Sequence, residues 1–115
     1  MNKIRVADYI AKFIKNKGIS DFFLLPGGGA MFLVDALGNY EGLNFVACHH
    51  EQSAAIAAES YSRVTQNFGV VLVTTGPGST NAITPVVGAW IESVPMMILS
   101  GQVKRSDQIG DRNVR

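Results

Sequence analysis

The side chains best suited to chemistry stand together, just before an alanine-rich segment with helical spacing: Cys48, His49, His50 and Glu51. A carboxylate in the first turn of a helix is stabilised by the helix dipole, which gives Glu51 a structural explanation. Burial would instead raise the pKa of its carboxyl toward neutral pH, as a group that transfers protons requires. The helix start lowers the same pKa, so the sequence leaves the protonation state of Glu51 open.

The helix that begins near Glu51 has no ordinary N-cap in the sequence. No Ser, Thr, Asp or Asn directly precedes it, although these residues usually accept a hydrogen bond from the first turn. Departures from a local rule of this kind are expected where function takes priority. We therefore expect a helix that starts without a side-chain cap, next to a functional carboxylate.

A metal site is not expected at Cys48, His49 and His50. Adjacent residues point in different directions, and the sequence has no second cluster with the spacing of zinc ligands. We expect Cys48 to be an inert thiol in the core, and the two histidines to flank a site or simply to pack. Cys48 is the one cysteine of the chain, so no internal disulfide can form, which fits a reducing compartment and predicts a cytoplasmic location.

Three further segments are rich in glycine or polar residues, at positions 26–29, 75–81 and 100–102. Glycine lets a ligand approach the backbone closely, but it also suits a tight turn between a strand and a helix. Ser79 or Thr80 could cap a helix whose free N–H groups would hold an anion or a carbonyl oxygen. The chain has neither the glycine spacing of dinucleotide-binding folds nor a lysine-containing phosphate loop, which disfavours nucleotide binding.

Alternating apolar and amphipathic segments position these groups. Strands are predicted at residues 21–25, 44–48, 69–75 and 95–99, and helices at residues 6–17, 30–37, 50–65 and 81–93. Continuous apolar strands that alternate with helices are typical of a parallel sheet covered on both faces. We therefore predict a three-layer α/β/α fold with a mostly parallel, flavodoxin-like doubly wound sheet. In such a sheet Glu51 and the three loops lie at the carboxyl edge, where ligands bind.

The composition fits one small globular domain and disfavours several classes of partner. The chain has 115 residues, 47% of them hydrophobic, and a formal net charge of +1. This charge gives no electrostatic basis for binding nucleic acid, and no apolar run is long enough to span a membrane. The composition becomes strongly charged after Val103. We therefore predict a domain at residues 1–103 and a charged loop or tail at residues 104–115.

Three motifs together resemble the N-terminal pyrimidine-binding domain of thiamine-diphosphate-dependent enzymes, in the branch of acetolactate synthases and pyruvate oxidases. They are His50-Glu51-Gln52 with the alanines that follow, residues 69–81 with the sequence GVVLVTTGPGSTN, and Ser100-Gly101-Gln102. The resemblance covers residues 3–103 in order and spacing. His49 departs from it, because acetolactate synthases usually have arginine at this position. This difference leaves the identity of the substrate open, but not that of the cofactor.

The resemblance implies that the domain binds the aminopyrimidine ring of thiamine diphosphate. It implies that Glu51 is catalytic and hydrogen-bonds ring nitrogen N1′, and that Gln102 faces the substrate. The other cofactor-binding residues that it implies are Pro26, Gly27, Gly28, Thr75, Pro77 and Asn81. The implied reaction is decarboxylation of a small 2-oxo acid and transfer of the remaining fragment to an acceptor, in a decarboxylase or carboligase. These residues do not decide whether FAD is bound as well.

The resemblance also implies a partner, because the family binds the cofactor diphosphate through Mg²⁺ in a separate C-terminal domain with a Gly-Asp-Gly…Asn motif. Gly110-Asp111-Arg112-Asn113 does not match that motif. We therefore expect a fragment of a longer enzyme or a separate subunit, inactive alone, which assembles as a homodimer or tetramer with a diphosphate-binding domain. The apolar segments at residues 54–58 and 83–91, the latter with Trp90, are expected to contribute to the interface.

Two alternatives to a catalytic domain remain open in the sequence. One is a non-catalytic α/β binding or assembly module with the same fold. The other is an unrelated flavodoxin-like domain that binds a small anion. Glu51 distinguishes the first alternative from an enzyme, since a module without chemistry has no reason to keep a carboxylate there.

Overall fold

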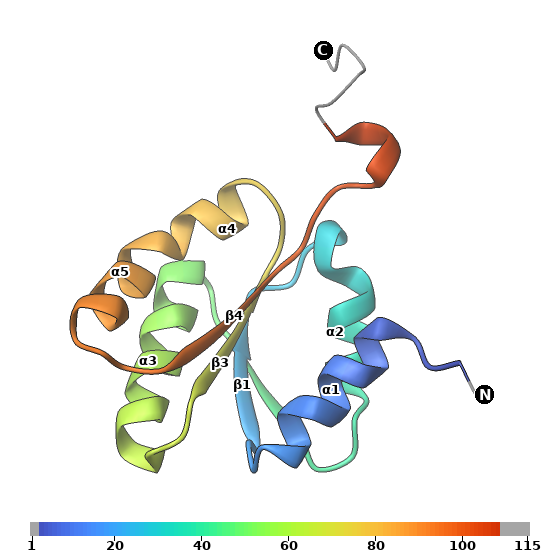
Figure 1. The fold of residues 1–115 in the computed structure, drawn as a ribbon. Coiled ribbons are helices and arrows are strands. Elements are labelled where there is room, and N and C mark those ends of the chain that lie inside the picture. Colours follow the sequence, from blue (N-terminus) through green and yellow to red (C-terminus); the bar gives the residue numbers. More distant parts are fainter. Residues whose placement is uncertain (1–2, 109–115) are drawn as a thin grey trace.

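The computed structural model describes residues 3–108, which form a four-stranded parallel sheet with helices on both faces (Figure 1). The strands lie in the order β2-β1-β3-β4, and each pairs in parallel with its neighbours. The elements in chain order are α1 (Val6–Asn16), β1 (Asp21–Leu24), the 3-10 helix η1 (Gly28–Ala30), α2 (Met31–Gly38), β2 (Asn44–Ala47), α3 (Glu51–Thr65), β3 (Gly69–Val73), α4 (Pro77–Asn81), α5 (Ile83–Ile91), β4 (Met96–Ser100) and the 3-10 helix η2 (Arg105–Asp107). Within the described part of the chain, none of the helices has the length and apolar character needed to cross a bilayer.

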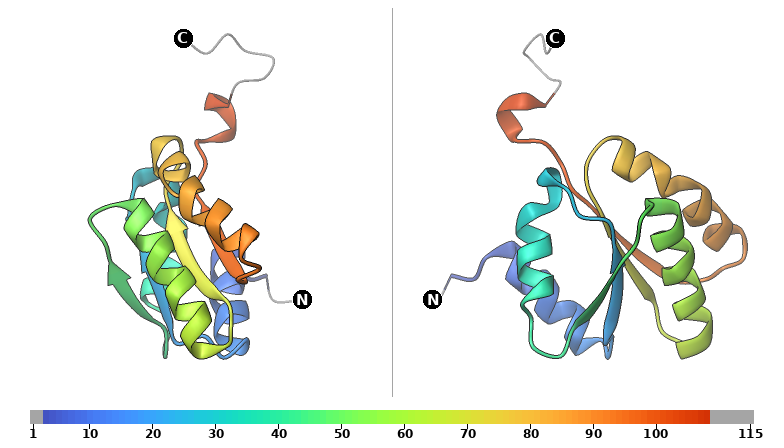
Figure 2. Two further views of the ribbon diagram at one scale, coloured as in Figure 1. Left: turned by 90° about the vertical axis from the view of Figure 1, so that its left-hand side faces the viewer. Right: turned by 180° about the vertical axis from the view of Figure 1, so that it is seen from behind.

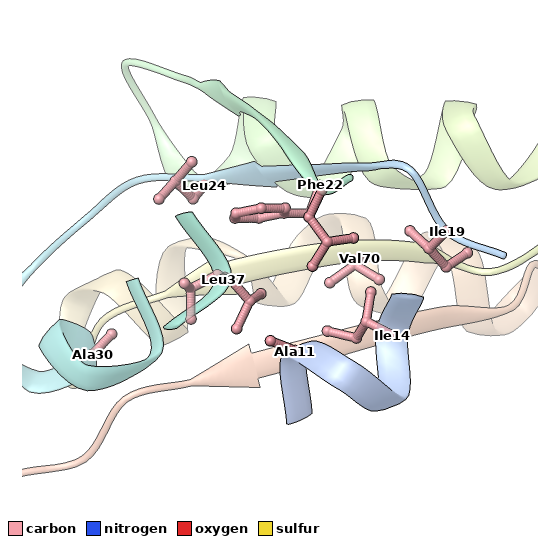
Figure 3. Close-up of a cluster of buried hydrophobic side chains, with 10 residues drawn as sticks. Ala11, Ile14, Ile19, Phe22, Leu24, Ala30, Leu37 and Val70 are labelled. Atoms are coloured by element: carbon pink, nitrogen blue, oxygen red, sulfur yellow. The ribbon is translucent and has the colours of Figure 1, made fainter. Parts of the chain in front are cut away.

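Helices α1 and α2 cover one face of the sheet, and α3 and α5 cover the other, as Figure 2 shows. Alternate residues of a strand point to opposite faces, and β3 is buried along its whole length. Val70 and Leu72 join the hydrophobic cluster on the side of α1 and α2, which is drawn in Figure 3. Val71 and Val73 join the second cluster, which packs against α3. The predicted three-layer α/β/α fold is confirmed.

Helix α3 lies close to the sheet because small residues face it. Ala54, Ala55 and Ala58 are fully buried at this contact. A Cβ atom added to Gly69, at the start of β3, would lie only 1.8 Å from the carbonyl oxygen of Ala58. The backbone of α3 therefore rests directly on β3. Because Glu51 is the first residue of α3, this contact helps to fix its position relative to the sheet.

The two edge strands are more exposed than their apolar sequences predicted. β2 is exposed at all four of its residues, and β4 is only partly covered. Each pairs with a neighbour on one side only in the described sheet, so the prediction of strands covered throughout was wrong for these two. The prediction that Cys48 lies in the core is also corrected. Cys48 is partly buried just after β2, at the border of the α3 cluster.

The helix predicted at residues 81–93 is replaced by two shorter helices. α4 begins with Pro77 at a position where proline is favoured, and α5 begins at Ile83. Pro85 explains the break, because it has no N–H to donate to the carbonyl of Asn81 and its ring excludes a carbonyl at that position. Asn81 is thereby the last residue of α4.

Residues 104–108 are exposed and extend beyond β4, with η2 among them (Figure 1). The rest of the tail predicted at residues 104–115, including Gly110-Asp111-Arg112-Asn113, lies outside the described residues. The boundary at residue 103 stays a prediction.

Candidate functional site

Glu51 begins α3 at the carboxyl edge of the sheet, and within residues 3–108 it is the only charged residue that is buried, at 7% exposure. Its Oε2 accepts a hydrogen bond of 3.0 Å from Nδ2 of Asn81. This bond is the main cause that lowers the pKa of Glu51 below its ordinary value. Burial raises the pKa, while the backbone N–H of Glu51 and the His50 side chain lower it further. Glu51 is therefore ionised at neutral pH, which the sequence had left open.

His50 caps α3, so the expectation of an uncapped helix start was wrong. Its Nδ1 accepts a hydrogen bond of 3.0 Å from the backbone N–H of Gln52. The backbone of His50 is extended, as an N-cap residue requires, and its imidazole replaces the side-chain oxygen that usually accepts this bond. His49 is exposed beside it. In the part of the chain that the structure covers, no group of three or more His, Cys, Asp or Glu side chains could hold a metal ion.

The first turn of α4, which follows β3, places backbone against the Glu51 carboxylate. Gly78 is buried, and a Cβ atom added to it would lie 3.3 Å from Oε1 of Glu51. Such a contact is tighter than ordinary van der Waals packing, so glycine keeps this oxygen clear. Gly76 supplies the turn that precedes α4, with a φ of 60° that favours glycine.

The hydroxyls of Ser79 and Thr80 do not cap α4, contrary to expectation, because both residues lie within that helix. Ser79 Oγ donates a hydrogen bond of 2.7 Å to the carbonyl of Thr74, and Thr80 Oγ1 donates one of 3.3 Å to the carbonyl of Pro77. Neither is the residue before α4, which is Gly76 and has no side chain to offer. Ser79 instead joins α4 to the end of β3.

Thr74 links the loop after β1 to the start of α4 at this edge, and its role was not predicted from the sequence. Its Oγ1 accepts a hydrogen bond of 3.2 Å from the backbone N–H of Gly29. A Cβ atom added to Gly27 would lie 2.5 Å from Cβ of Thr74, and one added to Gly78 would lie 2.7 Å from its Cγ2. Thr74 therefore packs between the glycine loop after β1 and the start of α4. The sequence feature that could have pointed to Thr74 is its place as the first polar residue after the apolar segment of β3.

The three glycines after β1 are there for different reasons. Gly27 faces Thr74, and a Cβ atom added to Gly29 would lie 2.8 Å from Cγ2 of Thr75. A Cβ atom added to Gly28 would meet nothing within 4 Å. Protein packing therefore explains Gly27 and Gly29, whereas Gly28 borders open space. An open hollow of about 440 Å³ lies here, lined by Pro26, Gly27, Gly28, Met31, Val34 and Asp35.

The end of β4 joins the same edge. The backbone N–H of Gln102 donates a hydrogen bond of 3.2 Å to the carbonyl of Gly29. The exposed side chain of Gln102 accepts, at Oε1, a hydrogen bond of 3.4 Å from Oγ1 of Thr75 and one of 2.8 Å from the N–H of Val103. Two of the predicted site residues, Gln102 and Thr75, are thus in contact.

The structure brings the four predicted segments together. β1 and β3 are adjacent while β2 lies on the far side of β1, so the loops after β1 and β3 meet where the direction of chain winding changes. Ligands of open α/β sheets bind at this switch point. Pro26 is exposed on its loop and Pro77 is exposed at the start of α4, and Asn81 and Glu51 are joined by a hydrogen bond. A buried, ionised carboxylate here can hold a ring nitrogen that carries a proton.

Comparison with known proteins identifies the family. The sequence model of the family described as "Thiamine pyrophosphate enzyme, N-terminal TPP binding domain" matches residues 4–113, which include Glu51 and all of these loops. The chain belongs to this family. Thiamine pyrophosphate is another name for thiamine diphosphate, so the resemblance found in the sequence is confirmed.

The chain is similar to subunits of acetolactate synthases. It is 43% identical over 100 residues to the acetolactate synthase large subunit of Buchnera aphidicola subsp. Schizaphis graminum, covering 87% of this chain and 18% of that protein. It is 40% identical over 106 residues to the acetolactate synthase isozyme 3 large subunit of Escherichia coli, covering 92% and 18%. For the mitochondrial catalytic subunit of Saccharomyces cerevisiae, the identity is 40% over 95 residues, covering 83% and 14%. The chain thus spans less than a fifth of the length of these relatives.

Proposed function

We propose that this domain holds the aminopyrimidine ring of thiamine diphosphate, with Glu51 as the partner of ring nitrogen N1′. The enzyme that we propose is an acetolactate synthase-like decarboxylase or carboligase acting on a small 2-oxo acid. The observation that carries the proposal is the buried carboxylate of Glu51, which Asn81 fixes through one oxygen only.

The oxygen of Glu51 that Asn81 does not engage fits a ring nitrogen that carries a proton. Asn81 engages Oε2, and within residues 3–108 no other residue donates a hydrogen bond to Oε1. Gly78 borders Oε1 and has no side chain that would crowd it. Oε1 is therefore the oxygen that we assign to N1′.

A proton must enter the site when the ring binds. A neutral pyrimidine nitrogen and an ionised carboxylate both accept hydrogen bonds, so their contact leaves both unpaired unless a proton is added. Because the bond from Asn81 lowers the pKa of Glu51, that proton is absent before binding and is taken up from solvent. Glu51 then shares it with N1′ and sets the charge of the ring. The bound cofactor itself supplies the carbanion chemistry.

The other proposed site residues border the cofactor or the substrate. Pro26, Gly27 and Gly28 line one side of the cofactor site, and Thr75 and Pro77 border the pyrimidine from the loop after β3. Gln102 lies beside Thr75, where it would face the substrate. We assign the diphosphate and its Mg²⁺ to a separate domain of the same enzyme, for which the greater length of the relatives leaves room.

Exposed apolar residues on α5 support an assembly. Ile83, Val87, Trp90 and Ile91 recur at helical spacing and are each about half exposed or more, with Trp90 at 85%. We propose that this face contributes to a homodimer or tetramer. A strict monomer at high concentration in size-exclusion chromatography with light scattering would contradict the assembly.

We also propose that the protein is cytoplasmic, because its single cysteine is unpaired.

The proposal is tested by release of carbon dioxide from pyruvate and other small 2-oxo acids, measured on the purified native protein with thiamine diphosphate and Mg²⁺. Glu51→Gln should lower the rate by about 100-fold or more, as expected for loss of a proton-transfer group. Glu59→Gln is the matched control, because Glu59 lies on the same helix and pairs with Arg63 instead. Equal rates for wild type and Glu51→Gln would favour the non-catalytic module.

A further inference from the structure

We propose that Thr74 is a positioning residue that joins the glycine loop to Glu51, with its hydroxyl holding the loop and its methyl group holding the backbone beside the carboxylate. The part of this inference that concerns cofactor binding rests on the proposed function. The packing part does not, and it can be tested without any cofactor.

The hydroxyl of Thr74 fixes the loop that carries Gly28. Oγ1 accepts the 3.2 Å hydrogen bond from the N–H of Gly29. The carbonyl of Gly29 in turn accepts the N–H of Gln102 at 3.2 Å. Gly28 lies between Gly27, which packs on Thr74, and Gly29, which is bonded to it. The position of the open glycine thus depends on Thr74.

The methyl group of Thr74 fixes the opposite side of the site. Cγ2 occupies the place that a Cβ atom on Gly78 would need, at 2.7 Å. The same Cβ atom would lie 3.3 Å from Oε1 of Glu51. Gly78 is therefore held between Thr74 and the carboxylate. In addition, the carbonyl of Thr74 accepts the hydroxyl of Ser79, which holds the first turn of α4.

Two conservative variants separate these roles. Thr74→Val keeps a methyl group at the position of Cγ2 but removes the acceptor for the N–H of Gly29. Thr74→Ser keeps that acceptor but removes the methyl group beside Gly78. A residue that only filled space would tolerate Thr74→Val, which keeps its volume, and would respond only to Thr74→Ser.

The first experiment measures the cofactor dependence of the native protein. Thr74→Val should raise the KM for thiamine diphosphate about fivefold to tenfold, as expected for one lost hydrogen bond, and leave kcat within about twofold. Thr74→Ser keeps the acceptor and should raise the KM less than Thr74→Val does. The control Thr65→Val should keep the wild-type KM, because its hydroxyl donates to the carbonyl of Tyr61 at the far end of α3. An unchanged KM in Thr74→Val would overturn the role of the hydroxyl. Failure of the wild type to bind thiamine diphosphate would instead overturn the proposed function.

The second experiment measures thermal unfolding without cofactor. It asks whether a second substitution at Thr74 restores the stability that a glycine substitution removes. Gly78→Ala should lower the Tm by about 5–15 °C, because its methyl group collides with Cγ2 of Thr74. Adding Thr74→Ser vacates that space, so the double variant should recover more than half of the loss. Gly27→Ala is the matched control, since its methyl group would meet Cβ of Thr74 at 2.5 Å, an atom that serine retains.

Rescue of Gly78→Ala but not of Gly27→Ala is the expected pattern. Additive losses in the double variant with Gly78→Ala, or equal rescue of both glycine variants, would overturn the inference. Each outcome is read from the Tm alone, so it stands whether or not the cofactor assignment is correct.

Discussion

Replacing Asn81 by alanine removes the one hydrogen bond that another side chain donates to the Glu51 carboxylate within residues 3–108. Hydrogen bonds to charged groups contribute about 1.5–3 kcal/mol to stability. Asn81 is itself exposed, so the lower end of this range applies. We expect Asn81→Ala to lose about 1.5 kcal/mol of unfolding free energy at pH 7, which lowers the Tm by roughly 6 °C in a domain of this size.

The loss should depend on pH, and the lowered pKa of Glu51 fixes the sign. A carboxyl whose pKa is lower in the folded state contributes stability above its unfolded pKa, and this stability disappears as the pH falls through the folded pKa. Without Asn81 the largest cause of the lowering is gone, so the folded pKa rises toward the ordinary value of 4.5. The difference in stability between wild type and Asn81→Ala should therefore be largest at neutral pH and should shrink in acid.

Urea unfolding at a series of pH values measures this difference, and carboxyl NMR follows the titration of Glu51 directly. Asn39→Ala is the matched control, because the Asn39 amide donates a 3.0 Å hydrogen bond to the carboxylate of Asp35, which is exposed. It should leave the pKa of Glu51 unchanged. A loss in Asn81→Ala that is the same at every pH, or an unchanged Glu51 titration, would refute the reasoning.

Three further predictions concern the elements around the site. Gly69→Ala should lower the free energy of unfolding by about 3 kcal/mol or more, because its methyl group collides with the Ala58 carbonyl. Gly88→Ala should raise it by about 0.5–1 kcal/mol, because the added methyl group meets nothing within 4 Å. Shifts of Tm with the same sign in the two variants would contradict this. His50→Ala should lower the free energy of unfolding by about 1 kcal/mol, and His50→Asn should restore most of this loss because asparagine is a good N-cap. An unchanged Tm in His50→Ala would argue against the cap. The 115-residue chain alone should bind thiamine diphosphate weakly and release no carbon dioxide from pyruvate; turnover would contradict the need for a second domain.

Much of the fold follows from the pattern of apolar runs. β3 is short, apolar and rich in valine, and it proved to be a central strand of the parallel sheet that is buried along its whole length. The same pattern in β2 predicted burial that the structure does not have, because strand order cannot be read from local sequence. The break before Pro85 was missed because proline is tolerated near a first turn. The helix in fact begins at Pro77, so Pro85 would lie well inside a continuous helix, where it excludes the carbonyl of Asn81.

The site was predictable where it depends on residue type and strand ends. Glu51 and the glycine loops could be placed at one edge, since the carboxyl ends of parallel strands meet there. The contacts of Thr74 and Asn81 could not be derived, because they join segments whose separation depends on helix packing and on the break between α4 and α5. The cap by His50 was missed because imidazole is a rare acceptor at that position.

The central claim is that Glu51 shares a proton with the aminopyrimidine ring, and calorimetry of cofactor binding tests it most directly. Thiamine diphosphate is titrated into the native protein at pH 7 in two buffers of different ionisation enthalpy, which reports the protons taken up. Wild type and Glu59→Gln should take up on the order of one proton, whereas Glu51→Gln should take up none because its amide brings its own N–H. Equal uptake by wild type and Glu51→Gln, or none by wild type, would contradict the account.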